Sequence, residues 1–176
     1  MDNVNGIKSL NEIFGNFSSL LTAGKVESEN HVRKLVIDRI VENVWKFSCG
    51  FDEPGTYQEE TDIRVGHGTT VHPDYELRCA GGKKVLIEAK SPTEDLDKWV
   101  DQLKGYVNLT NASAGILING REFRLYLTDH NGAMDVEPFR TLVVECVSED
   151  DLAFVLGLFS AGFVFNDGQI NEASFR

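Results

Sequence analysis

The chain has 176 residues, 41% of them hydrophobic, so it can bury one good core, and we expect a single domain over residues 1–176. Its 17 Lys and Arg are outnumbered by 28 Asp and Glu, and the net charge of −11 argues against autonomous nucleic-acid binding, which rests largely on cationic contacts. Three widely separated cysteines argue against disulfides and structural zinc and favour the cytoplasm, and no apolar run is long enough to span a membrane.

Two helices are predicted before any strand. Residues 7–21 carry Leu, Ile and Phe on one face, which is typical of a helix that packs against a core. A second helix is predicted from Ser28, a suitable N-cap, to about Phe47, with one apolar stripe. Glu29 falls in the middle of that stripe and Arg33 at its shoulder, so both are candidate site residues. The alternative is a first-turn Glu that the helix dipole favours, with Arg33 reaching solvent.

Residues 57–65 form a weaker strand candidate, and two histidines follow it. His67 lies in a Gly-His-Gly loop, and His72 precedes a proline, which holds the chain extended. A metal or general-base role is conceivable for both histidines. Neither has a partner at helical i,i+4 spacing, so we interpret both as structural or exposed.

A β-hairpin is predicted next, with arms at residues 74–79 and 83–90 and glycines between them. Alternate side chains on the arms make one apolar set, and the other set is mostly polar. A two-residue turn would mix the two sets. A three-residue turn at residues 80–82 keeps them apart and pairs Asp74 with Glu88. Lys90 then shares the face of Glu88, so the burial pattern alone brings two carboxylates and an ammonium together.

The segment after Lys90 has the pattern of a helix start, with Ser91 as N-cap, Pro92 in the first turn and Glu94 closing a capping box. The helix should run to about Leu109 and bury an apolar stripe composed of Leu96, Trp99, Val100, Leu103 and Val107. Gln102 and Tyr106 lie one turn apart at the edge of that stripe. They can reach one groove together, although such a pair is more often an ordinary helix edge.

The remaining elements complete an α+β order. A strand at residues 114–118 should turn at Asn119-Gly120 into a second strand at residues 123–127. A further strand and a core helix are expected over about residues 141–165; that helix could alternatively dock onto a partner or a second copy of the chain. The order is helix, strands, helix, strand, so we predict a mixed sheet of about four to five strands flanked by helices.

Five elements in this order resemble the P-D…(D/E)-x-K nuclease superfamily. The matching residues are Glu29 on the first core helix, Pro73-Asp74, Glu88-Ala89-Lys90, and then Gln102 and Tyr106. The arrangement is most similar to the N-terminal nuclease domain of type I restriction enzyme motor subunits. The resemblance covers roughly residues 28–127, the expected nuclease core.

The resemblance implies a restriction-endonuclease-like fold and a metal-dependent DNA endonuclease. Asp74, Glu88, the Ala89 carbonyl and Glu29 would hold Mg²⁺, for which Mn²⁺ could substitute, and Lys90 would act on the attacking water. Gln102 and Tyr106 would support the scissile-strand phosphate or the metal's outer shell. Hard oxygen ligands suit magnesium. The sequence contains no Gly-Lys-Ser/Thr phosphate loop, so translocation would need a partner, such as a translocase. The net charge of −11 makes us expect that DNA affinity also depends on a partner, such as other restriction-modification subunits.

Two other classes of function stay open. The first is a catalytically silent member of the same fold that serves as an assembly or regulatory module. A homo-oligomer is also possible. The second is an acidic interaction protein that mimics DNA, which the net charge favours. The DNA mimic leaves the predicted Asp74, Glu88 and Lys90 cluster unexplained.

Overall fold

A seven-stranded mixed sheet forms the centre of the computed structural model, which describes residues 3–50, 53–60, 62–65 and 68–158. The strand order in this sheet is β1-β2-β5-β6-β7-β8-β9, and β3 and β4 form a separate two-stranded ribbon. The strands are β1 (Ser48–Cys49), β2 (Thr56–Glu59), β3 (Ile63–Val65), β4 (Thr69–Val71), β5 (Tyr75–Arg78), β6 (Lys84–Ala89), β7 (Ala114–Ile118), β8 (Glu122–Leu127) and β9 (Arg140–Val143). The helical segments are α1 (Asn3–Thr22), α2 (Glu29–Val32), η1 (Arg33–Ile37), η2 (Ile40–Val44), η3 (Ala80–Gly82), η4 (Leu96–Trp99), α3 (Val100–Thr110), η5 (Val144–Cys146) and α4 (Glu149–Gly157).

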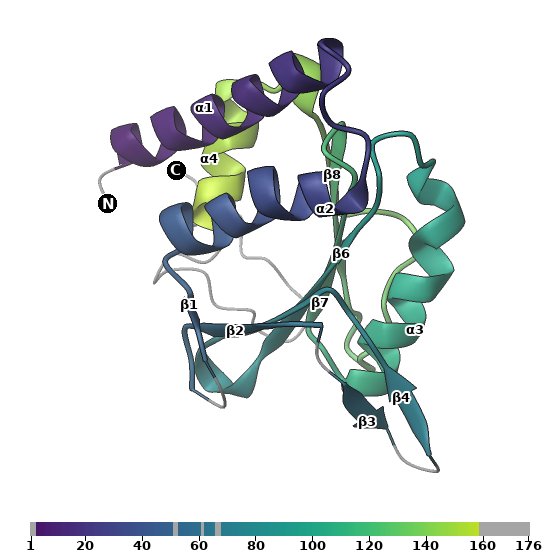
Figure 1. The fold of residues 1–176 in the computed structure, drawn as a ribbon. Helices are drawn as coiled ribbons and strands as arrows, with labels where there is room; N and C mark the ends of the chain where they lie inside the picture. Colours follow the sequence, from purple (N-terminus) through teal and green to yellow (C-terminus); the bar gives the residue numbers. More distant parts are fainter. Residues whose placement is uncertain (1–2, 51–52, 61, 66–67, 159–176) are drawn as a thin grey trace.

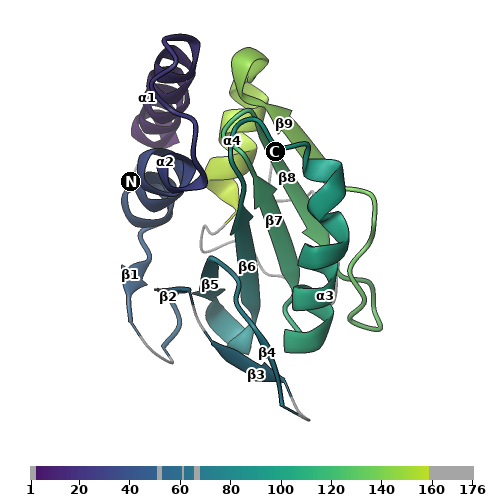
Figure 2. The same ribbon diagram turned by 45° about the vertical axis from the view of Figure 1, so that its right-hand side comes forward.

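Helices cover both faces of the sheet. Figures 1 and 2 show α1, α2 and α4 on one side and α3 alone on the other. The larger apolar core lies under the three helices, and a smaller one lies between α3 and the sheet around Leu86, Leu103 and Leu117. Strands β6 and β7 are parallel, so α3 is the crossover that joins them. The α+β architecture predicted from the sequence is therefore confirmed.

The hairpin of β5 and β6 has the register that the burial pattern predicts. Tyr75 lies opposite Ile87 and Leu77 opposite Val85, and the Cys79 amide donates to the Lys83 carbonyl at 2.8 Å. The connection is the expected three-residue turn, in which both glycines have positive φ, 71° at Gly81 and 73° at Gly82. Continued by one residue, the same register sets Asp74 opposite Glu88.

The second face of the hairpin is buried, although the sequence predicts mostly polar residues on it. Glu76 is only 1% exposed and pairs with Arg78 and Lys84. Leu86 on the same face packs in the smaller core. The reason is the parallel pairing of β6 and β7, because a crossover helix covers the face that an isolated hairpin would leave in water.

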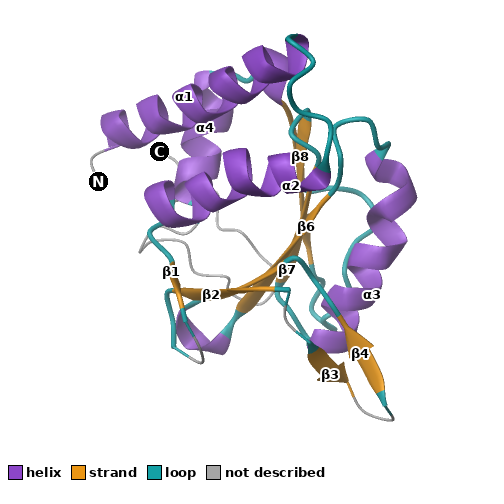
Figure 3. Ribbon diagram, in the orientation of Figure 1, coloured by secondary structure: helices purple, strands orange, loops and turns teal. Residues whose placement is uncertain are grey.

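The sheet is larger than the predicted four to five strands, and the predicted strand at residues 57–65 is wrong as a single element. The chain leaves the sheet at Glu60, which has a positive φ of 47°, and β3 then pairs with β4 instead. The ribbon lies beside α3 (Figure 3), and Ile63 packs against the smaller core. A residue in the left-handed region ends a strand, but the Glu-Glu-Thr-Asp sequence gives no glycine signal for it.

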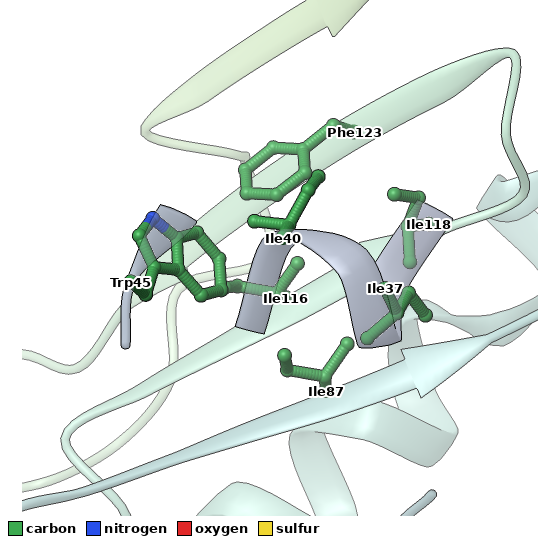
Figure 4. Close-up of a pocket in the computed structure, with 7 residues that line it drawn as sticks. All are labelled: Ile37, Ile40, Trp45, Ile87, Ile116, Ile118 and Phe123. Carbon is green, nitrogen blue, oxygen red and sulfur yellow. The ribbon is translucent and has the colours of Figure 1, made fainter. Parts of the chain in front are cut away.

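The helix predicted from Ser28 begins there and ends at Val44. The Ser28 side chain accepts from the His31 amide, which caps α2, and η1 and η2 continue the run as two π-helical segments. Phe47 is buried although it follows the helix. An apolar cavity of about 10 Å³ lies between this run and the sheet, lined by Ile37, Ile40, Trp45, Ile87, Ile116, Ile118 and Phe123 (Figure 4). The cavity is lined only by apolar side chains, and such cavities stay dry.

The helix predicted to begin at Ser91 begins later, at Leu96. Residues 91–94 form a turn in which the Glu94 amide donates to the Ser91 carbonyl. Asp95 caps the helix because its carboxylate accepts from the Asp97 amide at 3.1 Å. The Glu94 carboxylate accepts from the Trp99 indole at 3.3 Å instead of closing a capping box. Trp99 and Val100 are only half-buried, whereas the rest of the predicted stripe is buried.

The terminal helices pack against each other on the same side of the sheet. Helix α1 is longer than the predicted 7–21, and α4 begins after Ser148, which forms a capping box with Asp151. The strand expected near residue 141 is β9. The part of the predicted C-terminal helix after Leu158 lies outside the described residues. None of the described helices is long and apolar enough to cross a membrane.

Candidate active site

Glu88 and Lys90 lie at the carboxyl end of β6, on the face that α3 covers. Both are nearly buried, with exposed fractions of 4% and 7%. The Lys90 ammonium donates to Glu88 Oε1 at 2.7 Å and lies over the Trp99 ring, 4.2 Å from its centroid. The pair is therefore held between the end of β6 and Trp99, the last residue of η4.

Asp74 reaches the same place from the start of β5. Its Oδ2 accepts a hydrogen bond from the Ala89 amide at 2.7 Å, so the carboxylate contacts β6 between Glu88 and Lys90 in the sequence. Its Oδ1 lies 3.8 Å from Arg33 Nη1. Pro73 and Asp74 lie between β4 and β5, and the hairpin register places Asp74 at the end of β6.

Glu29 approaches from the other side of the sheet as the first residue of α2. Burial raises its pKa, and the charge of Asp74 raises it further, while Lys90 and Arg33 lower it. Glu29 thus feels the charges of Asp74, Lys90 and Arg33, and its place in the site stays a prediction.

Burial shifts Glu88 toward its neutral form. Burial raises the pKa of this carboxyl from its ordinary value of 4.5 to about 7, and the charge of Asp74 adds to the effect. The hydrogen bond from Lys90 lowers the pKa but does not offset the burial. The pKa of Asp74 is also raised, mainly by burial, against the Ala89 hydrogen bond and Arg33. Crowded acids with raised pKa values are typical of functional sites.

The donor chemistry at the end of β6 fits a hard divalent cation. Glu88 Oε2 is buried and has no hydrogen-bond partner among the described residues, which is costly for a carboxylate. Among the same residues no group of three or more His, Cys, Asp or Glu is arranged to hold a metal ion. Magnesium needs only one or two carboxylates, since water and substrate oxygens supply the rest. Asp74 and Glu88 are two carboxylates of this kind; their roles as metal ligands stay predictions, as does the role of Glu29, directly or through water.

Gln102 and Tyr106 lie on α3, beyond Trp99. Gln102 Nε2 donates to the Tyr106 hydroxyl at 2.9 Å, so the i,i+4 pair does act as a unit. In the described part of the chain no hydrogen bond joins either residue to Glu29, Asp74 or Glu88. Gln102 Oε1 is buried without a partner. Their support of a phosphate stays a prediction.

Sequence reasoning missed three residues that shape the site. Trp99 has the spacing of a core residue, yet its ring covers the Lys90 ammonium. Glu59, the last residue of β2, and Glu60, which follows it, bind Arg33 at 3.0 and 2.5 Å. Arg33 is only 8% exposed, so it does not reach solvent as the alternative reading supposes. A buried arginine needs carboxylate partners, so the position of Arg33 beside the apolar stripe could have indicated that acidic residues lie nearby.

Of the two histidines singled out in the sequence, only His72 lies in the described part of the chain. His72 is exposed and its Nδ1 lies 2.7 Å from Asp62 Oδ1, away from the hairpin acids. His67 lies outside the described residues. Cys79 packs against the larger core, as predicted, and burial raises the pKa of its thiol to about 12.

Comparison with known proteins supports the fold alone. No family model and no curated protein matches the chain. A solved structure described as the cryoEM structure of a DrdV–DNA complex is similar, with a TM-score of 0.59 over 87% of this chain at 16% identity. The chain spans only 14% of that protein. The mixed sheet flanked by helices is thus an arrangement that also occurs as a small part of a much larger protein.

Proposed function

We propose that this chain is a metal-dependent DNA endonuclease of the P-D…(D/E)-x-K type. The observation that carries the proposal is the convergence of Asp74, Glu88 and Lys90 at the end of β6, with one buried carboxylate oxygen left unpartnered. Two carboxylates and an ammonium on adjoining strands match the residues by which the sequence resembles that superfamily. The similar solved protein was bound to DNA, which supports DNA as the substrate.

The chemistry would be hydrolysis of a phosphodiester by water. A divalent cation bound by Asp74 and Glu88 would supply polarisation of the phosphate and a lowered pKa for water. Lys90 can donate a hydrogen bond to the attacking water or to a phosphate oxygen once Glu88 Oε1 no longer holds it alone. Trp99 keeps the ammonium at the site, since it leaves the ammonium little freedom to swing away.

The net charge of −11 makes a partner part of the proposal. Duplex affinity depends on cationic contacts, and eight of the chain's lysines and arginines already pair with acids in the described residues: Arg33, Lys34, Arg78, Lys84, Lys90, Arg121, Arg124 and Arg140. A restriction-modification subunit, a translocase or a further domain would supply DNA affinity.

A plasmid-nicking assay with Mg²⁺ or Mn²⁺ tests the proposal. Wild type should nick supercoiled DNA only with the metal, and Glu88→Gln and Lys90→Ala should abolish nicking. Glu137→Gln, an exposed glutamate away from the site, is the matched control and should cleave normally. Cleavage that Glu88→Gln leaves intact would end the proposal.

A catalytically silent module of the same fold is the second candidate. The observation that favours it is that no set of three described acids is arranged for a metal, while Lys90 and Arg33 already neutralise the carboxylates. Calorimetric titration with Mg²⁺ and Mn²⁺ separates the two. A silent module shows no binding that Glu88→Gln removes.

A further inference from the structure

Arg33 is the most heavily paired cation in the described part of the chain. Its Nη2 lies 3.0 Å from Glu59 Oε2, its Nη1 lies 2.5 Å from Glu60 Oε1 and 3.8 Å from Asp74 Oδ1, and its guanidinium lies 5.3 Å from the Tyr75 ring centroid. Its Nε is buried without a partner. The guanidinium is thus held beside Asp74 with one donor still unused.

The two glutamates that bind Arg33 differ in how firmly they are held. The Glu59 side chain is one-third exposed and also pairs with Lys34, so it belongs to a network on the helix. The Glu60 side chain is 71% exposed and its only ion pair among the described residues is with Arg33. Glu60 also carries an unfavourable backbone conformation, with φ at 47°. Its carboxylate is therefore an exposed anion held at the edge of the candidate site.

A phosphate group fits the place that the Glu60 carboxylate occupies. A guanidinium binds carboxylates and phosphates through the same planar fork of donors. This place lies beside Asp74, one of the two proposed metal ligands, because the same Arg33 Nη1 is 3.8 Å from Asp74 Oδ1. An arriving phosphodiester would replace one exposed anion by another, and Glu60 would swing into water at little cost.

Resting on the proposed function, we infer that Arg33 is a phosphate-binding residue of the active site and that Glu60 occupies its anion position until substrate arrives. Glu60 is then a built-in competitor that lowers DNA affinity. In this inference Arg33 both holds Asp74 in place and orients the DNA phosphate next to the scissile bond.

The test is DNA binding measured by fluorescence anisotropy on a labelled short duplex, in the Glu88→Gln background so that no cleavage occurs. Adding Glu60→Gln should strengthen binding by about two- to fivefold, the modest range expected when an ion pair with one exposed partner no longer competes. Adding Glu137→Gln changes the net charge equally and should alter affinity much less. Arg33→Lys keeps the charge but loses the fork, and it should weaken binding and remove the benefit of Glu60→Gln.

Equal effects of Glu60→Gln and Glu137→Gln would overturn the inference, because only bulk charge would then matter. A benefit of Glu60→Gln that survives in Arg33→Lys would also overturn it. Since the assay measures binding alone, its failure leaves Mg²⁺-dependent nicking by wild type, and hence the proposed function, intact. If wild type does not nick DNA but Glu60→Gln still strengthens binding through Arg33, the proposed endonuclease activity is refuted and the phosphate-binding role of Arg33 is retained.

Discussion

Replacing Glu88 by glutamine should stabilise the metal-free protein at pH 8. The uncharged amide resembles the neutral form that the site prefers, whereas wild type must ionise a carboxyl whose pKa the fold raises from 4.5 to about 7. At 1.36 kcal/mol per pKa unit, this rise corresponds to about 3 kcal/mol. Because the folded pKa lies above the unfolded one, the folded state binds more protons between pH 4.5 and about 7. Wild-type stability therefore falls as pH rises through that window.

Guanidinium unfolding with a chelator present measures the effect. We expect Glu88→Gln to exceed wild type by about 3 kcal/mol at pH 8 and the difference to vanish below about pH 4.5. Glu137→Gln should show no such pH-dependent gain. If Glu88→Gln is instead less stable than wild type at pH 8, the ion pair with Lys90 outweighs the burial of the carboxylate and the reasoning is refuted.

The remaining predictions concern metal, the Trp99 ring and the core. Mg²⁺ at 100 times its Kd should stabilise wild type by about 2.7 kcal/mol, which a thermal melt detects as a higher melting temperature, and should leave the melting temperature of Glu88→Gln unchanged. An equal gain in both proteins would place the metal elsewhere. Trp99→Leu should lower kcat for nicking about two- to thirtyfold with little change in KM, because about 0.5–2 kcal/mol of cation–π energy holds Lys90, and Trp99→Phe should recover most of it; equal loss in both variants would assign Trp99 to packing alone. Ile116→Ala, which enlarges the cavity of Figure 4, should lower the free energy of unfolding by about 2–5 kcal/mol in denaturant titration, and a loss below about 1 kcal/mol would show that the neighbouring side chains collapse into the gap.

The sequence predicts the hairpin well because burial imposes a strict rule on it. A shift of one residue would turn every apolar side chain to the wrong face, so Asp74 and Glu88 could be paired from the alternation alone. The helical period predicts the buried face of the second helix for a similar reason, since Val32, Val36, Ile40 and Val44 are all buried. Both inferences use a periodicity that the fold cannot violate cheaply.

The parts that escaped prediction depend on competition between local signals or on distant packing. Ser91 has the capping pattern, yet Asp95 caps the helix and Glu94 accepts from the Trp99 indole instead of closing a capping box. The chain leaves the sheet at Glu60 with a positive φ, but no glycine marks this position in the sequence. The raised pKa of Glu88 requires the cover of α3, which a strand pattern does not contain. The single-domain organisation stays a prediction.

The three-residue turn of the hairpin makes the spacing of the two opposed acids a matter of parity. Asp74 and Glu88 are separated by an even step, with the turn at its midpoint. Lengthening one arm by a single residue would send one carboxylate to the opposite surface, whereas a matched addition to each arm preserves the pairing. Relatives that retain this hairpin should therefore differ in its length by twos, a rule that can guide alignment where overall similarity has faded.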